Sequence, residues 1–205
     1  EIKEITYKRR NITTRRRIIS KRVTIIKPTS DTIQNLIRVI PDHPRPGVLY
    51  QDMASVFNAP QGVQHVMSLF RDYISDNNIE FNRIIGLDAR GFPMAGALSS
   101  ETGIPFSMAR KKGKLPGETI FTEYELEYGT DELHLQTDAI NKGDQVLIID
   151  DVIATGGTIE AVIKLTDRFE ADVVCILSIM ELEFLGGGAK LRDVGHDVYS
   201  ILQEQ

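Results

Sequence analysis

The chain has 205 residues, of which 41% are hydrophobic and 26% charged, enough apolar residues for the core of one α/β domain of ordinary size. No run approaches the roughly 18 consecutive apolar residues of a membrane-spanning helix. A single cysteine, Cys175, excludes an internal disulfide framework and fits a reducing, cytoplasmic location. It lies in DVVCILSIM, a predicted buried strand, so we expect an inert core thiol.

Charge divides the chain near Lys27-Pro28 into a basic arm, residues 1–27, and an acidic body, residues 28–205. The arm carries ten Lys or Arg against two Glu, a net charge of +8; since the whole chain carries −5, the body carries −13. Interleaved Ile, Thr and Val favour extended structure in the arm. Three interpretations remain open: a strand pair packed on the body or a partner subunit, a tail that binds nucleic acid or another polyanion, and part of an organelle presequence.

The body alternates amphipathic segments with short apolar runs, and several of its segments begin or end at recognisable caps and turns. In chain order we expect a helix at 31–40 capped by Thr29 or Ser30, a proline-rich loop at 41–53, a helix at 62–77, a strand at 83–88, a helix at 91–103, a strand at 104–108, a basic loop at 110–122, a hairpin of 124–128 and 132–137, a strand at 145–150, a helix at 157–169, and strands at 171–180 and 197–202. This alternation predicts an α/β fold with a mainly parallel central sheet and helices on both faces.

The stretch VLIIDDVIATGGT, residues 146–158, joins the end of a predicted buried strand to two acids and a glycine loop. Ligands bind beyond the carboxyl ends of strands in open parallel sheets. Asp150 and Asp151 are suited to the neighbouring hydroxyls of a sugar, and to a nearby divalent cation. The residues that follow form a candidate phosphate cradle of backbone amides and hydroxyls at a helix N-terminus: Ala154, Thr155, Gly156, Gly157 and Thr158. A phosphorylated sugar is therefore the expected ligand.

The pattern is neither a Walker loop nor a dinucleotide fingerprint, because it lacks the Gly-Lys-Ser/Thr ending and its acids precede its glycines. It closely resembles the 5-phosphoribosyl-1-pyrophosphate (PRPP) motif of type I phosphoribosyltransferases. Further segments follow the order and spacing of the adenine phosphoribosyltransferase family, over roughly residues 31–205: PRPGVLYQDM (44–53), GLDARGF (86–92), RKKGKLPG (110–117) and LEYG (126–129). The resemblance implies the type I fold with a small hood and a mobile loop hairpin.

The resemblance assigns the pyrophosphate of PRPP to two basic or glycine-containing loops. In the first, Asp88, Ala89 and Arg90 would hold it, with a cis peptide expected near Asp88-Ala89. In the second, Arg110 and Lys114 would contact it, with Lys111 and Lys112 nearby, and some of these side chains would reach a neighbouring subunit.

Glu127 and Tyr128 match the family's Glu-Tyr pair beside that second loop. Departure of pyrophosphate leaves an oxocarbenium-like ribose, whose leaving group is stabilised by Mg²⁺ and cations. Under this resemblance Glu127 engages adenine N7 or manages the N9 proton, and Tyr128 excludes water. Arg90 and Lys114 complete the implied catalytic set. Asp150 and Asp151 would influence the metal indirectly, through PRPP and water.

GVLYQD, residues 47–52, matches the family's hood over the base. There, backbone groups near Leu49 would read the adenine edge and Tyr50 would stack on it. Gln51, the third residue expected to bind the base, stands where the family normally has Arg. The change alters charge and reach and raises a question about base preference, affinity or activity.

The resemblance implies purine salvage: adenine and PRPP giving AMP and pyrophosphate with Mg²⁺, in a homodimer without membrane association. Two alternatives remain open, an enzyme with another base preference and a catalytically silent PRPP-binding paralogue. The four histidines, His43, His65, His134 and His196, show no metal-ligand spacing.

Overall fold

A computed structural model describes residues 27–126 and 129–205, with side chains described outside 125–130. The arm before Lys27 and the pair Glu127–Tyr128 lie outside the described residues, so the expectations for them remain predictions. Within the described part of the chain, no helix is long and apolar enough to cross a membrane.

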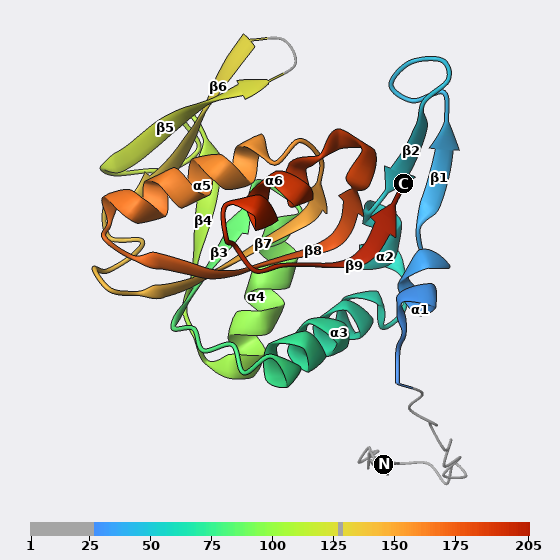
Figure 1. The fold of residues 1–205 in the computed structure, drawn as a ribbon, viewed down its shortest axis with the longest axis horizontal. Coiled ribbons are helices and arrows are strands. Elements are labelled where there is room, and N and C mark those ends of the chain that lie inside the picture. Colours follow the sequence, from blue (N-terminus) through green and yellow to red (C-terminus); the bar gives the residue numbers. More distant parts are fainter. Residues whose placement is uncertain (1–26, 127–128) are drawn as a thin grey trace, which may run out of the picture.

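The centre of the molecule is a seven-stranded sheet in the order β5-β6-β4-β3-β7-β8-β9 (Figure 1). Its strands are β3 (Arg83–Leu87), β4 (Phe106–Lys111), β5 (Thr119–Leu126), β6 (Gly129–Gln136), β7 (Gln145–Ile153), β8 (Asp172–Leu182) and β9 (Val198–Glu204). Strands β4, β3, β7, β8 and β9, which are adjacent in that order, pair in parallel, whereas β6 pairs antiparallel with β4 and β5. The expected mainly parallel sheet is confirmed.

Helices cover both faces of the sheet, as the apolar strands require. They are α1 (Ser30–Gln34), α2 (Ala54–Asn58), α3 (Gly62–Asp76), α4 (Gly91–Thr102), α5 (Gly157–Arg168) and α6 (Gly187–Asp193), with a short 3-10 turn at Glu183–Leu185. One core lies between the sheet and α5 with α6, and the other between the sheet and α1 to α4. Neighbouring residues of β7 alternate between them: Ile148 faces the first core and Leu147 the second.

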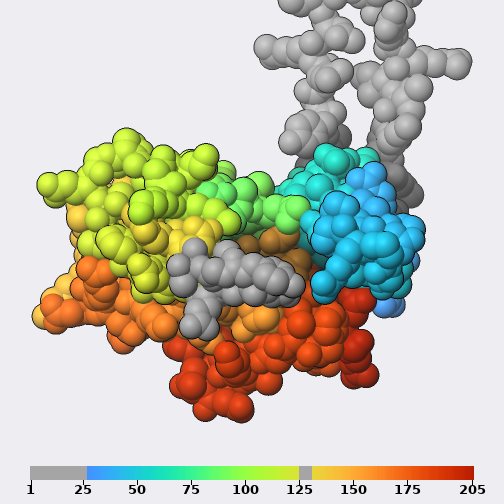
Figure 2. Space-filling model, turned by 90° about the horizontal axis from the view of Figure 1, so that it is seen from above, coloured from blue at the N-terminus to red at the C-terminus, as the bar shows by residue number. Residues whose placement is uncertain are grey.

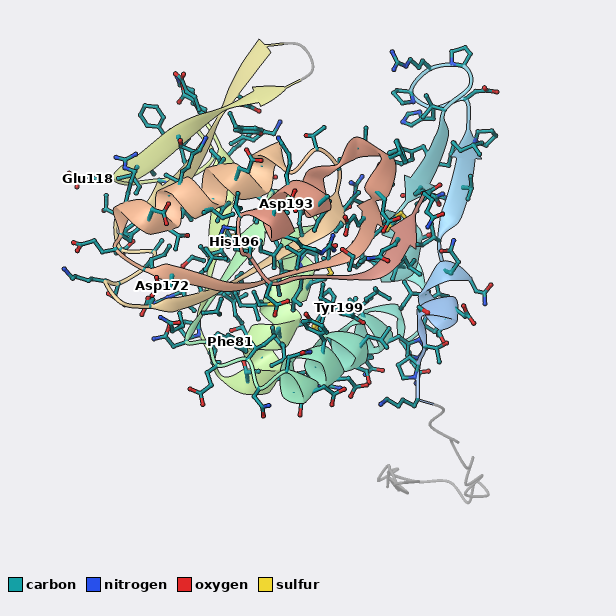
Figure 3. The ribbon with its side chains drawn as sticks, viewed as in Figure 1. Phe81, Glu118, Asp172, Asp193, His196 and Tyr199 are labelled. Atoms are coloured by element: carbon teal, nitrogen blue, oxygen red, sulfur yellow. The ribbon has the colours of Figure 1, made fainter. Side chains whose placement is uncertain are left out.

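The expected helices at 62–77, 91–103 and 157–169 are confirmed as α3, α4 and α5. On α3, Phe70 is fully buried, and Tyr73 stacks on Tyr199 of β9 with ring centroids 4.1 Å apart. Figure 3 labels Tyr199, which lies between β9 and α3. The Tyr73 hydroxyl donates to Asp197 Oδ1 at 2.6 Å, fixing this helix against the sheet edge. Cys175 is buried in the second core, as expected, and burial raises the pKa of its thiol.

The expected helix at 31–40 is wrong in its second half. Thr29 caps α1, which ends at Gln34, and Arg38–Pro41 forms strand β1 paired antiparallel with β2 (Leu49–Asp52). The β-branched Val39 and Ile40 favour a strand, and Pro41 cannot continue a helix. Arg38 is also tied across the ribbon to Asp52 by an ion pair. This ribbon, residues 38–52, is called the hood below.

Several other segments differ from their expected extents. Strand β2 lies inside the proline-rich loop expected at 41–53. In the hairpin, β5 begins at Thr119 rather than at 124, and β6 begins at Gly129 rather than at 132. The basic loop expected at 110–122 is shorter, because β4 runs on to Lys111 and β5 begins at Thr119. Helix α6 was not expected, because its seven residues begin with two glycines, which are poor helix formers.

Candidate functional site

The polar segments singled out by sequence meet at the carboxyl edge of three adjacent parallel strands. β3 lies between β4 and β7, with Leu87 opposite Ala109 and Gly86 opposite Ile149. The residues just beyond these pairs therefore converge on one edge. Figure 2 views this side, with the hood in blue at one end and the yellow-green β4–β6 segment at the other.

The loop after β3, residues 88–91, is held tightly against β7. Its Asp88-Ala89 peptide is cis, as expected. A Cβ on Gly91 would lie 2.4 Å from the carbonyl oxygen of Ile149, so only glycine allows this approach. Asp88 Oδ2 accepts a hydrogen bond from Arg110 Nε at 3.2 Å, which ties the end of β3 to the end of β4.

Asp150 and Asp151 adjoin one another near the end of β7, and one cation compensates them. Arg90 Nη1 donates to Asp151 Oδ2 at 3.2 Å, and the amide of Asp151 donates to Asp150 Oδ1 at 2.9 Å. Desolvation, and next the charge of Asp151, raise the pKa of Asp150 well above its usual value. The pair thus presents carboxylate oxygens with one charge balanced by Arg90.

The 154–158 loop connects β7 to α5 and rests directly on the start of α6. Gly156 has a φ of 84°, a left-handed conformation that favours glycine. The amide of Gly187 donates to the carbonyl of Ala154 at 3.1 Å. A Cβ on Gly187 would lie 2.3 Å from that carbonyl oxygen. The loop leads into the N-terminus of the twelve-residue α5, where free amides and the helix dipole attract anions.

The hood reaches the acid pair through one aromatic side chain. Arg90 Nη2 donates to the hydroxyl of Tyr50 at 3.0 Å, so the same guanidinium that bonds Asp151 also bonds the hood. The imidazole of His43 packs edge-on against the Tyr50 ring, with centroids 5.0 Å apart. Leu49 is 63% exposed at the hood surface.

Gln51 is directed to the C-terminal strand rather than to solvent. Its Nε2 donates to Glu204 Oε1 on β9 at 3.1 Å. Its Oε1 is buried and has no hydrogen-bond partner among the described residues. The amide therefore fastens the hood to β9, and the position next to Tyr50 is not free to rotate.

A second polar network connects the β5–β6 hairpin to the end of β4. Lys111 Nζ lies 2.8 Å from Asp131 Oδ2, and the Tyr124 hydroxyl donates to the same oxygen at 3.4 Å. The hydrogen bond from Lys111 is the main cause that lowers the pKa of Asp131. The carbonyl of Lys114 accepts from Arg110 at 3.2 Å, which fixes the turn after β4.

The described residues contain no group of three or more His, Cys, Asp or Glu side chains that could hold a metal ion by themselves. Asp88, Asp150 and Asp151 nevertheless supply oxygen atoms, the ligand type that Mg²⁺ prefers. Because Mg²⁺ usually keeps several waters and binds through substrate phosphates, this edge fits an ion that arrives with a phosphorylated ligand.

Comparison with known proteins identifies the family. A profile described as the phosphoribosyl transferase domain matches residues 52–204. The adenine phosphoribosyltransferase of Leptospira biflexa is 44% identical over 172 residues, which cover 83% of this chain and 96% of that protein. The chain belongs to the adenine phosphoribosyltransferase family.

Solved structures agree with this family assignment. The adenine phosphoribosyltransferase of Thermoanaerobacter pseudethanolicus is 38% identical, with a TM-score of 0.79 over 85% of this chain and 99% of that one. The enzyme from Saccharomyces cerevisiae, solved with an imino-altritol bisphosphate and adenine, is 34% identical, with a TM-score of 0.78 over 84% of this chain and 98% of that one.

Most residues that the resemblance to adenine phosphoribosyltransferases singles out meet at this edge. The acid pair, Arg90 and Tyr50 are joined by hydrogen bonds, while the 88–91 and 154–158 loops flank them. Lys114 enters these contacts through its carbonyl, and Glu127 and Tyr128 lie outside the described residues. Two residues at this edge were not expected from the sequence. Gly187 has no signal beyond the triplet Gly186–Gly188, and Asp131 lies opposite Tyr124 in the hairpin register.

Proposed function

We propose that this chain transfers the phosphoribosyl group from PRPP to adenine with Mg²⁺, giving AMP and pyrophosphate in purine salvage. One observation carries the proposal: an acid pair, a glycine loop at a helix N-terminus and a basic loop occupy one sheet edge, and Arg90 joins the acid pair to an aromatic hood residue. This arrangement matches PRPP and a planar base part by part.

The phosphoribosyl group is proposed to lie along the end of β7. Asp150 and Asp151 accept hydrogen bonds from the ribose hydroxyls. The 5-phosphate occupies the nest at the start of α5, formed by Ala154, Thr155, Gly156, Gly157 and Thr158. The close packing of this loop on Gly187 supports the assignment, because a preorganised cradle loses little entropy when it binds an anion.

The pyrophosphate is proposed to lie over the 88–91 loop. Its charge grows as the bond to ribose C1 breaks, so fixed cations there stabilise the transition state more than the bound substrate. Arg90, Arg110 and Lys114 supply that charge, and the amide of Ala89 adds a donor, while the amide of Asp88 is held by the carbonyl of Ala109. Arg110 is already oriented, because it bonds Asp88 and the carbonyl of Lys114.

A magnesium ion bound with PRPP would neutralise part of the pyrophosphate charge. Asp150 and Asp151 are proposed to contact this ion indirectly, through water and PRPP, and not to coordinate it directly.

The base is proposed to lie beneath the hood. Tyr50 stacks on adenine, and backbone groups near Leu49 read its edge. Gln51 is proposed to act by holding the hood on Glu204. Glu127 hydrogen-bonds adenine N7 or takes up the N9 proton, while Tyr128 keeps water from the developing cation.

A homodimer is proposed from apolar side chains that remain exposed on strands β4 and β5, on the sheet face opposite α5. Phe106, Met108 and Phe121 are 39%, 40% and 46% exposed. Their strand neighbours Ala109 and Ile120 pack into the core under α5, so the three exposed side chains share the opposite face. Apolar side chains gathered on one face mark a protein interface, here between copies of the chain. The proposed domain spans residues 28–205, with residues 1–27 as an appended arm, in a cytoplasmic protein.

The test is to incubate the protein with PRPP and Mg²⁺, offer adenine, hypoxanthine and guanine separately, and separate the products by chromatography. AMP from adenine alone is expected. Nucleotide from another base would change the substrate assignment. If no base gives a nucleotide while PRPP still raises the melting temperature, the chain is a catalytically silent PRPP-binding paralogue and not an enzyme.

A further inference from the structure

Arg90 is the one described residue that bonds both the acid pair and the hood. Its Nη1 donates to Asp151 Oδ2 at 3.2 Å and its Nη2 to the Tyr50 hydroxyl at 3.0 Å. Tyr50 belongs to the ribbon proposed to cover the base, and Asp151 to the pair proposed to hold the ribose. A single guanidinium therefore spans the two halves of the site.

We propose that the Tyr50 hydroxyl is a positioning group that holds Arg90 and thereby couples occupation of the pyrophosphate site to the affinity of the base site. The inference rests on the proposed function, and it adds to the ring's stacking role a separate role for the oxygen.

The geometry allows the coupling because a guanidinium has five N–H donors in a rigid fork. Two of them are used here, which leaves three for the oxygens of an incoming pyrophosphate. An anion can draw Nη1 from Asp151 while Nη2 keeps Tyr50. Asp151 then becomes available to the ribose hydroxyls.

The neighbouring contacts make this link specific. The Tyr50 ring is braced on its other side by His43, and Gln51 is fastened to Glu204 on β9. The hood is thus anchored to β9 through Gln51, away from the reacting atoms, and the Tyr50 ring is braced from within the hood by His43. The Tyr50–Arg90 bond is the described side-chain hydrogen bond that ties the hood to the 88–91 loop.

The coupling has a measurable consequence. If pyrophosphate fixes Arg90, and Arg90 fixes Tyr50, then pyrophosphate must tighten adenine binding, and adenine must tighten pyrophosphate binding by the same factor. The free energy that a hydrogen bond to a charged group contributes corresponds to about fivefold or more in affinity.

The experiment measures the dissociation constant of adenine by calorimetry, with and without saturating pyrophosphate and Mg²⁺. The ratio of the two constants is expected to be about five or more in the wild type. In Tyr50→Phe, which keeps the aromatic ring and removes the acceptor, the ratio should fall to within about twofold of one. Adenine binding alone is measured in each variant, so that any change in stacking is divided out.

Two further variants separate coupling from general damage. Tyr73→Phe is the matched control, because it also removes a hydrogen-bonded hydroxyl. That hydroxyl belongs to α3 and donates to Asp197, so this variant should keep the wild-type ratio. Arg90→Lys keeps the charge but lacks the paired N–H donors of the guanidinium, so its ratio should fall to near one. Adding Tyr50→Phe to Arg90→Lys should change the ratio no further.

The outcomes distinguish this inference from the function on which it rests. A wild type that makes AMP, with the same ratio in Tyr50→Phe, overturns the positioning role and leaves the proposed function intact. A wild-type ratio near one also overturns it. A wild type that neither binds adenine nor makes AMP overturns both.

Discussion

Gly187 is a sharp test of how the fold shapes the site, because it lies outside every segment expected to touch substrate. It begins α6, and its amide donates to the carbonyl of Ala154 in the 154–158 loop. Replacing it with alanine adds one methyl group beneath the loop proposed to bind the 5-phosphate.

The size of the disturbance follows from three distances. The added Cβ would lie 2.3 Å from the Ala154 oxygen and 2.5 Å from both the Gly156 nitrogen and the Thr155 carbonyl carbon. Ordinary contacts begin near 3.4 Å, so the loop must move by about 1 Å. Overpacking of this kind costs about 1–3 kcal/mol of stability. A misplacement of about 1 Å at a binding group lowers catalytic efficiency by about a hundredfold.

The assay compares Gly187→Ala with Gly96→Ala by steady-state kinetics and thermal unfolding. Gly96 lies in α4, where the nearest atom to an added Cβ is 3.8 Å away, so alanine fits there and favours the helix. We expect Gly187→Ala to raise the KM for PRPP and lower kcat/KM by about 10- to 100-fold, with a folded protein. The reasoning is refuted if Gly187→Ala has the same KM for PRPP as Gly96→Ala.

Three further predictions concern single side chains. The raised pKa of Asp150 means that this carboxyl gains a proton at a higher pH than an ordinary aspartate, and it then accepts hydrogen bonds from the ribose more weakly. In the wild type the affinity for AMP should therefore fall as the pH is lowered, and Asp150→Asn should remove this dependence. The same pH profile in both proteins, measured by calorimetry, contradicts this. Glu204→Ala should lower the unfolding free energy by about 1 kcal/mol and raise the KM for adenine, because it strands the buried amide of Gln51; kinetics in which only the KM for PRPP changes would argue against hood docking. Glu127→Gln should lower kcat by about a hundredfold or more while PRPP still raises the melting temperature, and parallel loss of both would make Glu127 a binding residue instead.

Much of the fold was predictable because the apolar pattern of each core element is complete in its own segment. The α3 and α5 faces and the buried β7 run are of this kind, and each was confirmed near its expected limits. The 31–40 segment failed because its helical and extended signals overlap: α1 takes the first half, and pairing with β2 fixes the second half as a strand. Local periodicity carries no information about a partner strand whose paired residues lie 8 to 14 positions further along the chain.

The site divides in the same way. Asp150, Asp151 and the 154–158 loop are contiguous, so their chemistry could be inferred from one short motif. The Arg90–Tyr50 bond joins residues forty positions apart, and the Gln51–Glu204 bond joins residues 153 positions apart. Such contacts depend on where the hood packs relative to the sheet, and residue spacing in a single sequence does not predict that position.

The most direct test of the account is pyrophosphate release from PRPP and adenine by the wild type and by Asp151→Asn, measured together with the unfolding of each. Asp151 is 8% exposed and bonds Arg90, so it lies between the proposed ribose and pyrophosphate subsites. We predict release by the wild type and a fall in kcat/KM of about a hundredfold or more in a variant that still unfolds cooperatively. Near wild-type turnover by Asp151→Asn would contradict the central claim and place the reaction elsewhere on the molecule.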